Sequence, residues 1–412
     1  MKGQFEAFAQ VAIVAAARTP WVDYRGALAQ VSPIDLGIHV ARGLLARAGV
    51  AASRVDSLLA GSMAQASFDA YLLPRHIGLY AGVPLEVPAL GVQRICATGL
   101  ELLRQAAAQV AQGTARLALC VASESMSRNP IASYEHRSGF RLGAPVGFKD
   151  FLWEALLDPA IGQGMIDTAE NLAQRYGLRR AEVDAFACDS FRKALQAQAT
   201  GWFDEEIVPV LAARFDLPGY QPRELHLPRG QQCVAHDSHP RPTSLAALAA
   251  LAPVTPGSVQ TAGNSCALVD GAAAALVARA DEVISPLALL RASAVVGVPP
   301  EVMGIGPAPA IRLLLDGAGL RLHEIDSVEI NEAQGAQVLA VQRELGLDPA
   351  CLNRHGGAIA LGHPLAATGL RLVHSVARQL AERGTRYGIA AACVGGGQGM
   401  ALLVENPRYQ GP

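Results

Sequence analysis

Two cysteines, one histidine and one asparagine occupy positions in the sequence where chemistry is favoured. Cys96 directly precedes Ala97-Thr98-Gly99, where a loop is expected to pass into a helix. The N-terminus of a helix carries partial positive charge and free N–H groups, which lower the pKa of a thiol and favour the nucleophilic thiolate. The alternative is a buried, inert cysteine, because free cysteine is among the most buried residue types.

His363 lies in a turn rich in glycine, within the segment 356–364, which reads GGAIALGHP. Gly362 permits a tight turn before it, and Pro364 restricts the backbone after it. A histidine near a thiol can take the thiol proton and hold the resulting charge, which activates the sulfur as a nucleophile. A histidine that only completes the turn is the alternative.

Cys393 and Asn331 each stand at the end of a predicted strand. Cys393 precedes the glycine run 395–397, whose N–H groups can form an anion-binding loop. Asn331 follows the strand predicted at 327–330, where its amide can orient a water or stabilise an oxyanion. Glycine turns and strand-end asparagines are also common structural features, so the prediction depends on the convergence of all four groups.

An internal repeat indicates how these residues meet. Several segments recur with an offset of 270 residues, for example Asp56 and Asp326, since 326 − 56 = 270. Because 363 − 270 = 93, His363 and Cys96 are predicted to lie on matching loops of two similar halves that meet across a pseudo-twofold axis. The repeated segments are 44–49 and 314–319, 55–57 and 325–327, and 97–100 and 367–370.

Each copy of the repeat is predicted to contain a helix that ends near a glycine turn, a short strand, a loop, a second helix and a second strand. The segments 115–122 and 387–394 are continuous apolar runs, typical of strands buried on both faces of a mostly parallel sheet. The run 11–17 is a further predicted strand and is too short for a membrane span. We therefore expect two α/β halves.

The chain is expected to divide into three parts. An N-terminal half at 1–128 is completed by about 257–282, and a C-terminal half covers 283–412. Between them, 129–256 is interrupted by proline and glycine and is predicted to be an inserted lobe, with helices at 168–176 and 180–198. Such lobes commonly shape substrate access.

Composition excludes several classes of protein. With 412 residues, 51% of them hydrophobic and 17% charged, the chain can bury at least two cores. The 34 basic and 36 acidic residues nearly balance, so no overall attraction to nucleic acid or an anionic membrane is expected. Seven cysteines without CxxC pairs match neither a disulfide framework nor a zinc site, and Glu6 and Gln10 interrupt any signal peptide. We therefore predict a cytoplasmic protein.

The sequence resembles the thiolase family over nearly its whole length, with motifs in the same order and spacing. The main ones are CATG at 96–99, ESMS at 124–127, NEA at 331–333, GGAIALGHP at 356–364 and CVGGG at 393–397. Weaker matches are RTP at 18–20, TAEN at 168–171, FDEEIVP at 203–209, DGAA at 270–273 and MGIGP at 303–307.

The resemblance implies two half-domains in a five-layered α/β/α/β/α fold, with 129–256 as a loop domain that receives coenzyme A. It implies thiolytic cleavage of 3-ketoacyl-CoA, or the reverse condensation, through an acyl-enzyme on Cys96 that His363 activates. Asn331 would hold a water for one oxyanion, the N–H groups of Cys96 and Gly395 would bind a second, and Cys393 would move the α-carbon proton. Coenzyme A is expected as a substrate, with no metal or other cofactor, and the chain as a homodimer or homotetramer.

Several positions differ from those most typical of acetoacetyl-CoA thiolases. Gly164 stands where a pocket histidine often precedes Met165, Cys266 replaces a serine that faces the pantetheine arm, and Gln334 replaces a phenylalanine. Val121-Ala122 replaces a Gly-Gly pair. The segments 264–270 and 366–369 look closer to thiolases that handle longer acyl chains.

Met165, Arg241 and Cys266 are the residues expected to bind substrate. Two rivals are a ketoacyl synthase, which pairs its cysteine with two histidines or with His and Asn, and a non-catalytic subunit that only binds acyl-CoA. Cys393 argues against the first rival. Retention of all four polar groups argues against the second.

Overall fold

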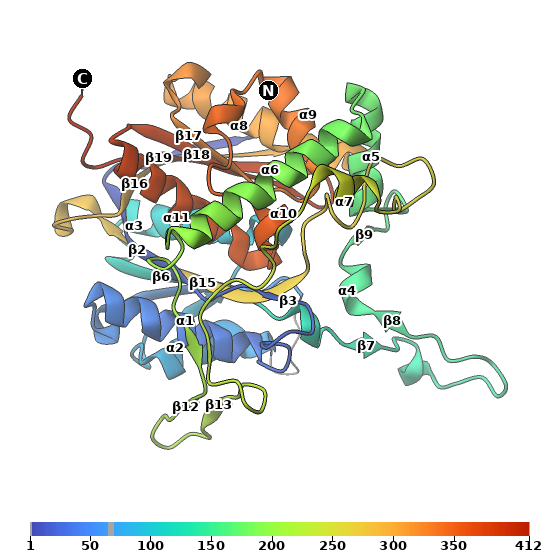
Figure 1. Cartoon of the computed structure of the whole chain (residues 1–412). Coiled ribbons are helices and arrows are strands. Elements are labelled where there is room, and N and C mark those ends of the chain that lie inside the picture. The colour runs from blue at the N-terminus through green and yellow to red at the C-terminus, as the bar shows by residue number, and fades with distance from the viewer. Residues whose placement is uncertain (1, 65–69, 412) are drawn as a thin grey trace.

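A computed structural model describes residues 2–64 and 70–411 (Figure 1). Its centre is an 11-stranded sheet in which the order is β17-β18-β19-β16-β2-β15-β6-β4-β5, with β1 and β3 added beside β16 and β15. The strands are β1 (Gln4–Ala7), β2 (Val11–Arg18), β3 (Val22–Asp23), β4 (Ser57–Gly61), β5 (Ala89–Gly91), β6 (Leu117–Glu124), β15 (Val269–Arg279), β16 (Ala288–Gly297), β17 (Ser327–Ile330), β18 (Tyr387–Val394) and β19 (Gln398–Glu405).

The sheet consists of two similar halves, which are joined because β16 of the second half pairs with both β1 and β2 of the first. β4 and β6 are parallel in the first half, as are β17 and β18 in the second, and each pair is followed by an antiparallel strand, β15 or β19. The halves meet where β2 pairs with β16, through Ala12 with Leu289 and Ile13 with Ala288. The predicted strand at 387–394 coincides with β18, whereas the one at 115–122 runs two residues further along the chain as β6.

Helices form three further layers around the two half-sheets, which confirms the α/β/α/β/α expectation (Figure 1). α1 (Pro33–Ala48) and α2 (Leu73–Ala81) cover the outer face of the N-terminal half. α8 (Pro307–Ala318) and α9 (Gly335–Leu345) cover the outer face of the C-terminal half. α3 (Thr98–Ala111) and α11 (Leu365–Arg383) pack between the halves and share one apolar core with both of them.

α3 and α11 cross at a pair of glycines. A Cβ atom added to Gly99 would lie 2.5 Å from the backbone nitrogen of Leu370, and one added to Gly369 would overlap with that of Leu100. The two glycines are separated by the repeat offset of 270 residues, so the pseudo-twofold axis passes between them. Glycine is required at both positions because the helix backbones touch there.

Segments of the predicted inserted lobe contact α1 of the N-terminal half and α9 of the C-terminal half (Figure 1). Its predicted helices are present, although the first begins three residues earlier, at Met165, where the Asp167 carboxylate accepts a bond from the N–H of Gly164. The elements of the lobe are β7 (Ile131–Ala132), β8 (Lys149–Asp150), α4 (Phe151–Glu154), β9 (Leu157–Asp158), β10 (Gln163–Gly164), α5 (Met165–Tyr176), α6 (Arg180–Ala199), β11 (Val210–Leu211), β12 (Ala213–Phe215), β13 (Arg223–Leu225), β14 (Cys233–Val234) and α7 (Leu245–Ala249).

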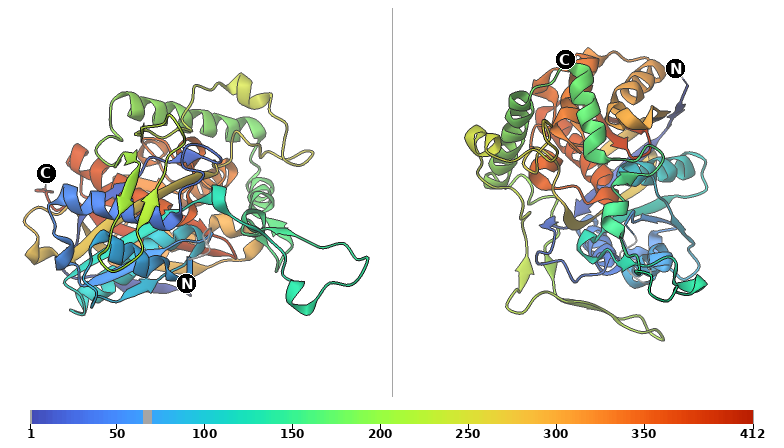
Figure 2. Two further views of the ribbon diagram at one scale, coloured as in Figure 1. Left: turned by 90° about the horizontal axis from the view of Figure 1, so that it is seen from below. Right: turned by 90° about the vertical axis from the view of Figure 1, so that its right-hand side faces the viewer.

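An arm at 129–150 projects from this lobe, away from the body of the molecule (Figure 2). The turn between β7 and β8 forms its tip. Among the described residues, none of the helices combines the length and the hydropathy that a membrane span needs.

Candidate active site

Cys96 lies in a single 3₁₀ turn, η3 (Ile95–Ala97), immediately before α3. The preceding residue, Ile95, has a φ of +44°, a left-handed conformation that is strained for a β-branched side chain. Thr98 holds this turn, since its hydroxyl donates to the Ile95 carbonyl at 2.7 Å and accepts the N–H of Arg94 at 2.9 Å. The strained turn fixes the backbone that carries the sulfur.

The protonation of Cys96 differs from the sequence prediction. Burial raises the pKa of its thiol to about 12, and the charge of Glu124 acts in the same direction. Hydrogen bonds from the N–H groups of Gly395 and of Cys96 itself lower this pKa, but by less than burial raises it. The predicted thiolate is therefore wrong for the resting protein, in which the sulfur is a thiol that requires a base.

His363 lies between α10 (Ala358–Leu361) and α11, and its side chain is buried. Asn331 Nδ2 donates to His363 Nε2 at 3.3 Å, which places the ring proton on Nδ1, where it is donated to Thr368 Oγ1 at 2.6 Å. Burial lowers the pKa of His363 to about 3, with a smaller contribution from the charge of Arg371. The imidazole is therefore neutral, with an unprotonated Nε2 that can accept a proton.

Asn331 follows β17 and connects this histidine to the sheet. Its backbone N–H donates to the Ala391 carbonyl of β18 at 2.9 Å, which extends the parallel pairing by one residue. Its Oδ1 atom is buried and has no hydrogen-bond partner within the described part of the chain. An unpaired buried acceptor is costly, so the site favours a water or ligand group that donates to it.

Cys393 is the second-last residue of β18 and is fully buried, in a cluster with Met303, Ala333 and Met165. Burial raises its pKa well above the ordinary value, and the charges of Cys96 and Cys266 raise it further. The N–H of Gly395, two residues after Cys393, donates to the Cys96 sulfur, so the turn after β18 adjoins the nucleophile turn. A Cβ atom added to Gly395 would lie 3.6 Å from both Ile95 Cγ2 and Met165 Sδ, so this glycine fits between the nucleophile turn and α5.

Two contacts join the Cys96 region to the His363 region. Leu365, two residues after His363, packs with Cys96. The buried Glu124 carboxylate accepts hydrogen bonds from the Ala366 N–H at 3.0 Å and the Ala64 N–H at 2.9 Å. Both contacts connect the N-terminal half to the start of α11.

The three predicted substrate-binding residues lie in two places. Met165, at the start of α5, packs in the cluster that contains Cys393. Cys266 donates its N–H to the Ala333 carbonyl at 3.1 Å, and burial, followed by the charge of Cys96, raises its pKa to about 12. Arg241 lies elsewhere in the lobe, with its guanidinium over the Phe191 ring at 4.9 Å and bonded to His239 Nε2 at 2.8 Å.

Three of the atypical positions have clear surroundings. Gly164 forms the N-cap of α5, and Val121-Ala122 is buried inside β6, which lies between β15 and β4. Gln334 forms the N-cap of α9 and is buried, with an Oε1 atom that lacks a partner among the residues described.

Sequence reasoning assigned no role to Thr368, Glu124 and Glu332. Thr368 had a signal, because it is the repeat mate of Thr98 at an offset of 270. Glu124 and Glu332 stand in the quoted ESMS and NEA motifs, but their donors come from distant segments that only the fold brings together.

Comparison with known proteins identifies the family. The model of the thiolase N-terminal domain matches residues 11–281, and that of the thiolase C-terminal domain matches residues 284–406. The chain is 39% identical over 403 residues to 3-ketoacyl-CoA thiolase, mitochondrial, of Bos taurus, and 40% identical over 405 residues to acetyl-CoA acetyltransferase of Pseudomonas aeruginosa. Each match covers 96% of this chain and 98% of the relative.

Solved structures agree with the sequence matches. Human mitochondrial 3-ketoacyl-CoA thiolase in complex with CoA superimposes with a TM-score of 0.91 at 37% identity, covering 97% of this chain and 99% of the human one. The fold and the site thus define an acyltransferase. The chain belongs to the thiolase family and has thiolase function.

Proposed function

We propose that this thiolase cleaves 3-ketoacyl-CoA with coenzyme A, and catalyses the reverse condensation of acyl-CoAs, through an acyl-enzyme on Cys96. The observation that carries the proposal is the position of the Cys96 sulfur, which accepts hydrogen bonds from the N–H groups of Cys96 itself and of Gly395, two residues after Cys393. A nucleophile, an oxyanion site and a second proton carrier are thereby brought together.

In the first half of the reaction, Cys96 attacks the 3-keto carbon while its proton passes to His363 Nε2. The N–H groups of Cys96 and Gly395 bind the oxyanion that forms. The bond between carbons 2 and 3 then breaks, and the enolate of acetyl-CoA leaves. His363 and a water bound by Asn331 stabilise that enolate, and Cys393 gives it a proton.

In the second half, the Cys393 thiolate takes the proton of an incoming coenzyme A thiol. The coenzyme A sulfur attacks the acyl group on Cys96, and His363 returns its proton to the departing Cys96 sulfur. Acyl-CoA is released, and both cysteines are thiols again. Since Cys96 has a raised pKa and His363 a lowered one, proton transfer accompanies the attack and does not precede it.

Coenzyme A enters this scheme as a substrate, and we propose no metal or further cofactor, because sulfur, imidazole and backbone N–H groups supply every step. The human thiolase of similar fold is in complex with CoA, which supports binding of the same group here. Met165 and Cys266, beside the reacting sulfurs, are proposed to contact the acyl and pantetheine portions. Arg241 is proposed to bind the more distant part of coenzyme A from the lobe.

The test is turnover together with trapping of the intermediate. When the protein is given free coenzyme A and acetoacetyl-CoA or a longer 3-ketoacyl-CoA, the absorbance of the magnesium enolate of the substrate is expected to fall. Acetyl-CoA should form at the same time. Mass spectrometry after brief incubation should place the acyl adduct on Cys96, and Cys96→Ser should abolish it. An adduct on another cysteine, or no turnover with any substrate from C4 to C16, would refute the proposal.

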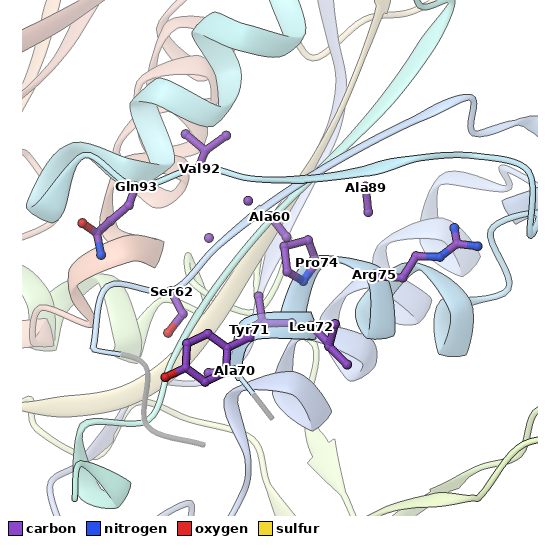
Figure 3. A pocket seen from close by; sticks show the side chains of 13 residues that line it. Ala60, Ser62, Ala70, Tyr71, Leu72, Pro74, Arg75, Ala89, Val92 and Gln93 are labelled. Carbon is purple, nitrogen blue, oxygen red and sulfur yellow. The ribbon is translucent and has the colours of Figure 1, made fainter. Parts of the chain in front are cut away.

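We propose further that the chain forms a homodimer or homotetramer. β5 is an edge strand, and beside it lies a pocket of about 490 Å³ lined by Ser62, Tyr71, Arg75 and Gln93 (Figure 3). Tyr71 and Leu90 are exposed at this edge, and unpaired edges with apolar side chains favour association. Large apolar side chains are exposed on the arm as well, namely Ile131, Tyr134, Phe140, Leu142 and Phe148. Light scattering after gel filtration gives the state, and a monomer at micromolar concentration would refute association.

A cytoplasmic location is also proposed. All seven cysteines are unpaired, and the mechanism needs two of them as thiols, which a reducing compartment preserves. Cell fractionation tests the proposed location, and recovery of the native protein from an oxidising or membrane-enclosed compartment would contradict it.

A further inference from the structure

Glu332 directly follows Asn331, and its side chain is buried. Its carboxylate accepts three hydrogen bonds from three separate segments: from Ser190 Oγ at 2.7 Å, from Asn353 Nδ2 at 2.8 Å and from the Ile359 N–H at 3.2 Å. Burial raises the pKa of this carboxyl, and the three donors oppose the shift by stabilising the charged form. A buried carboxylate with partners on three separate segments joins those segments to the end of β17.

One of these bonds leads to Asn331. The Asn353 side chain donates to the Ile330 carbonyl at 3.0 Å and accepts the Ile330 N–H at 2.9 Å, as a neighbouring strand would. Asn353 makes this contact in a left-handed conformation, with a φ of +43°. Glu332 accepts the bond from the same amide nitrogen and so holds this carboxamide against the residue that precedes Asn331.

The other two bonds lead to His363. Glu332 accepts the Ile359 N–H of α10, and Ser190 Oγ, itself bonded to Glu332, accepts the Gly357 N–H at 3.1 Å. A Cβ atom added to Gly357 would overlap with the Glu332 carboxyl group, which explains the second glycine of GGAIALGHP. Since α10 is a single turn that ends just before Gly362, anchoring its start also anchors His363.

We propose that Glu332 is a positioning residue that fixes the Asn331 carboxamide and the His363 imidazole relative to each other. It does so by clamping the end of β17 and the start of α10 to Ser190 of the inserted lobe. The inference rests on the proposed function and deepens it, because it names what holds the group that stabilises the enolate.

Glu332→Gln is a sharp test because the change keeps the shape and disrupts the bonding. Asn353 cannot turn its amide to compensate, since both ends of it are bonded to Ile330. The Ile359 N–H can only donate. In one orientation of the new side-chain amide, its NH₂ group faces the Asn353 Nδ2 donor, and in the other orientation it faces the Ile359 N–H.

The readout is kcat per active site, with sites counted by the acyl adduct on Cys96. For Glu332→Gln we expect kcat to fall roughly 10- to 100-fold and KM for the 3-ketoacyl-CoA to stay within about threefold, since this residue makes no proposed contact with substrate. Exchange of the acetyl-CoA α-protons with solvent deuterium should slow in parallel, because it depends on Asn331 and His363. A role only in folding would lower the number of active sites and leave kcat per site unchanged.

Two further variants complete the test. Ser190→Ala removes two of the bonds and suits a helix, so a drop in kcat of about 3- to 10-fold is expected with normal folding. Asp35→Asn is the control, because Asp35 is a buried carboxylate on the outer helix α1, paired with Arg223 at 2.6 Å. It should leave kcat per site unchanged.

The proposal is overturned if folded Glu332→Gln keeps kcat per site within about twofold of the wild type. If that variant does not fold, an unchanged kcat in Ser190→Ala overturns it. Failure of the proposed function would be seen separately, as missing turnover and a missing adduct in the wild-type protein.

Discussion

The hydroxyl of Thr368 sets which nitrogen of His363 is basic, and removing it should slow the reaction. The Thr368→Val change keeps the size and branching of a fully buried side chain, so packing in α11 is preserved. What is lost is the 2.6 Å hydrogen bond to His363 Nδ1. The ring proton then has no partner on Nδ1, or it moves to Nε2, where it faces the Asn331 amide and blocks the transfer from Cys96.

The size of the effect follows from either outcome. A buried donor without a partner costs about 1–3 kcal/mol. Since about 1.4 kcal/mol corresponds to a tenfold change in rate, kcat should fall roughly 5- to 150-fold. The assay is thiolysis of acetoacetyl-CoA, with kcat expressed per Cys96 that can be acylated.

Two matched variants separate the hydroxyl from the methyl group. Thr368→Ser retains the hydroxyl and should keep most of the activity. Ser375→Ala, on the same helix, removes a buried hydroxyl that has no partner among the described residues and should be neutral. The reasoning is refuted if Thr368→Val retains kcat within about twofold, or if Thr368→Ser is impaired as strongly as Thr368→Val.

Three further predictions concern protonation and packing. Alkylation of Cys96 by iodoacetamide should accelerate from pH 7 through pH 9 without a plateau, because burial raises its pKa to about 12; a plateau near pH 7 would show a preformed thiolate. Burial lowers the pKa of His374 to about 4, so below pH 6.5 the unfolded state binds more protons than the folded state, and stability decreases as the pH falls. Between pH 8 and pH 5, urea titrations should show a loss of unfolding free energy about 2 kcal/mol smaller in His374→Gln than in the wild type, and equal losses would contradict this. Gly99→Ala should lower the free energy of unfolding by about 2 kcal/mol or more because its Cβ meets backbone, whereas Gly91→Ala, whose nearest contact is 3.5 Å away, should change it little.

Much of the fold could be predicted because the relevant signals are local. The continuous apolar run at 387–394 gave the bounds of β18 correctly. The offset of 270 residues predicted the matching halves, and the contact between α3 and α11 gives the physical reason why glycine occurs at the same position, Gly99 and Gly369, in both copies.

Misplaced bounds had non-local causes. β6 extends to Glu124, past the apolar run, because donors from both halves satisfy that buried carboxylate. α11 begins at Leu365, before the Ala-Thr-Gly segment, because the same carboxylate accepts the Ala366 N–H of its first turn. Neither partner is visible in the local sequence.

In the candidate site too, local signals could be read from the sequence and effects of tertiary packing could not. The sequence pointed to Cys96, His363, Cys393 and Asn331 from their positions at strand and helix ends. The charge state of Cys96 was wrong because the helix-terminus argument considers only neighbouring backbone, whereas desolvation by Met63, Met126 and Leu152 depends on tertiary packing.

The neutral resting state of Cys96 has a consequence for how the protein survives oxidative stress. Peroxide attacks thiolates far faster than thiols, and a buried sulfur whose pKa is about 12 is almost wholly protonated in a neutral cell. Burial should therefore make the resting sulfur a poor target for peroxide. At neutral pH its reactivity therefore depends on a base that takes the thiol proton, the role proposed for His363 Nε2.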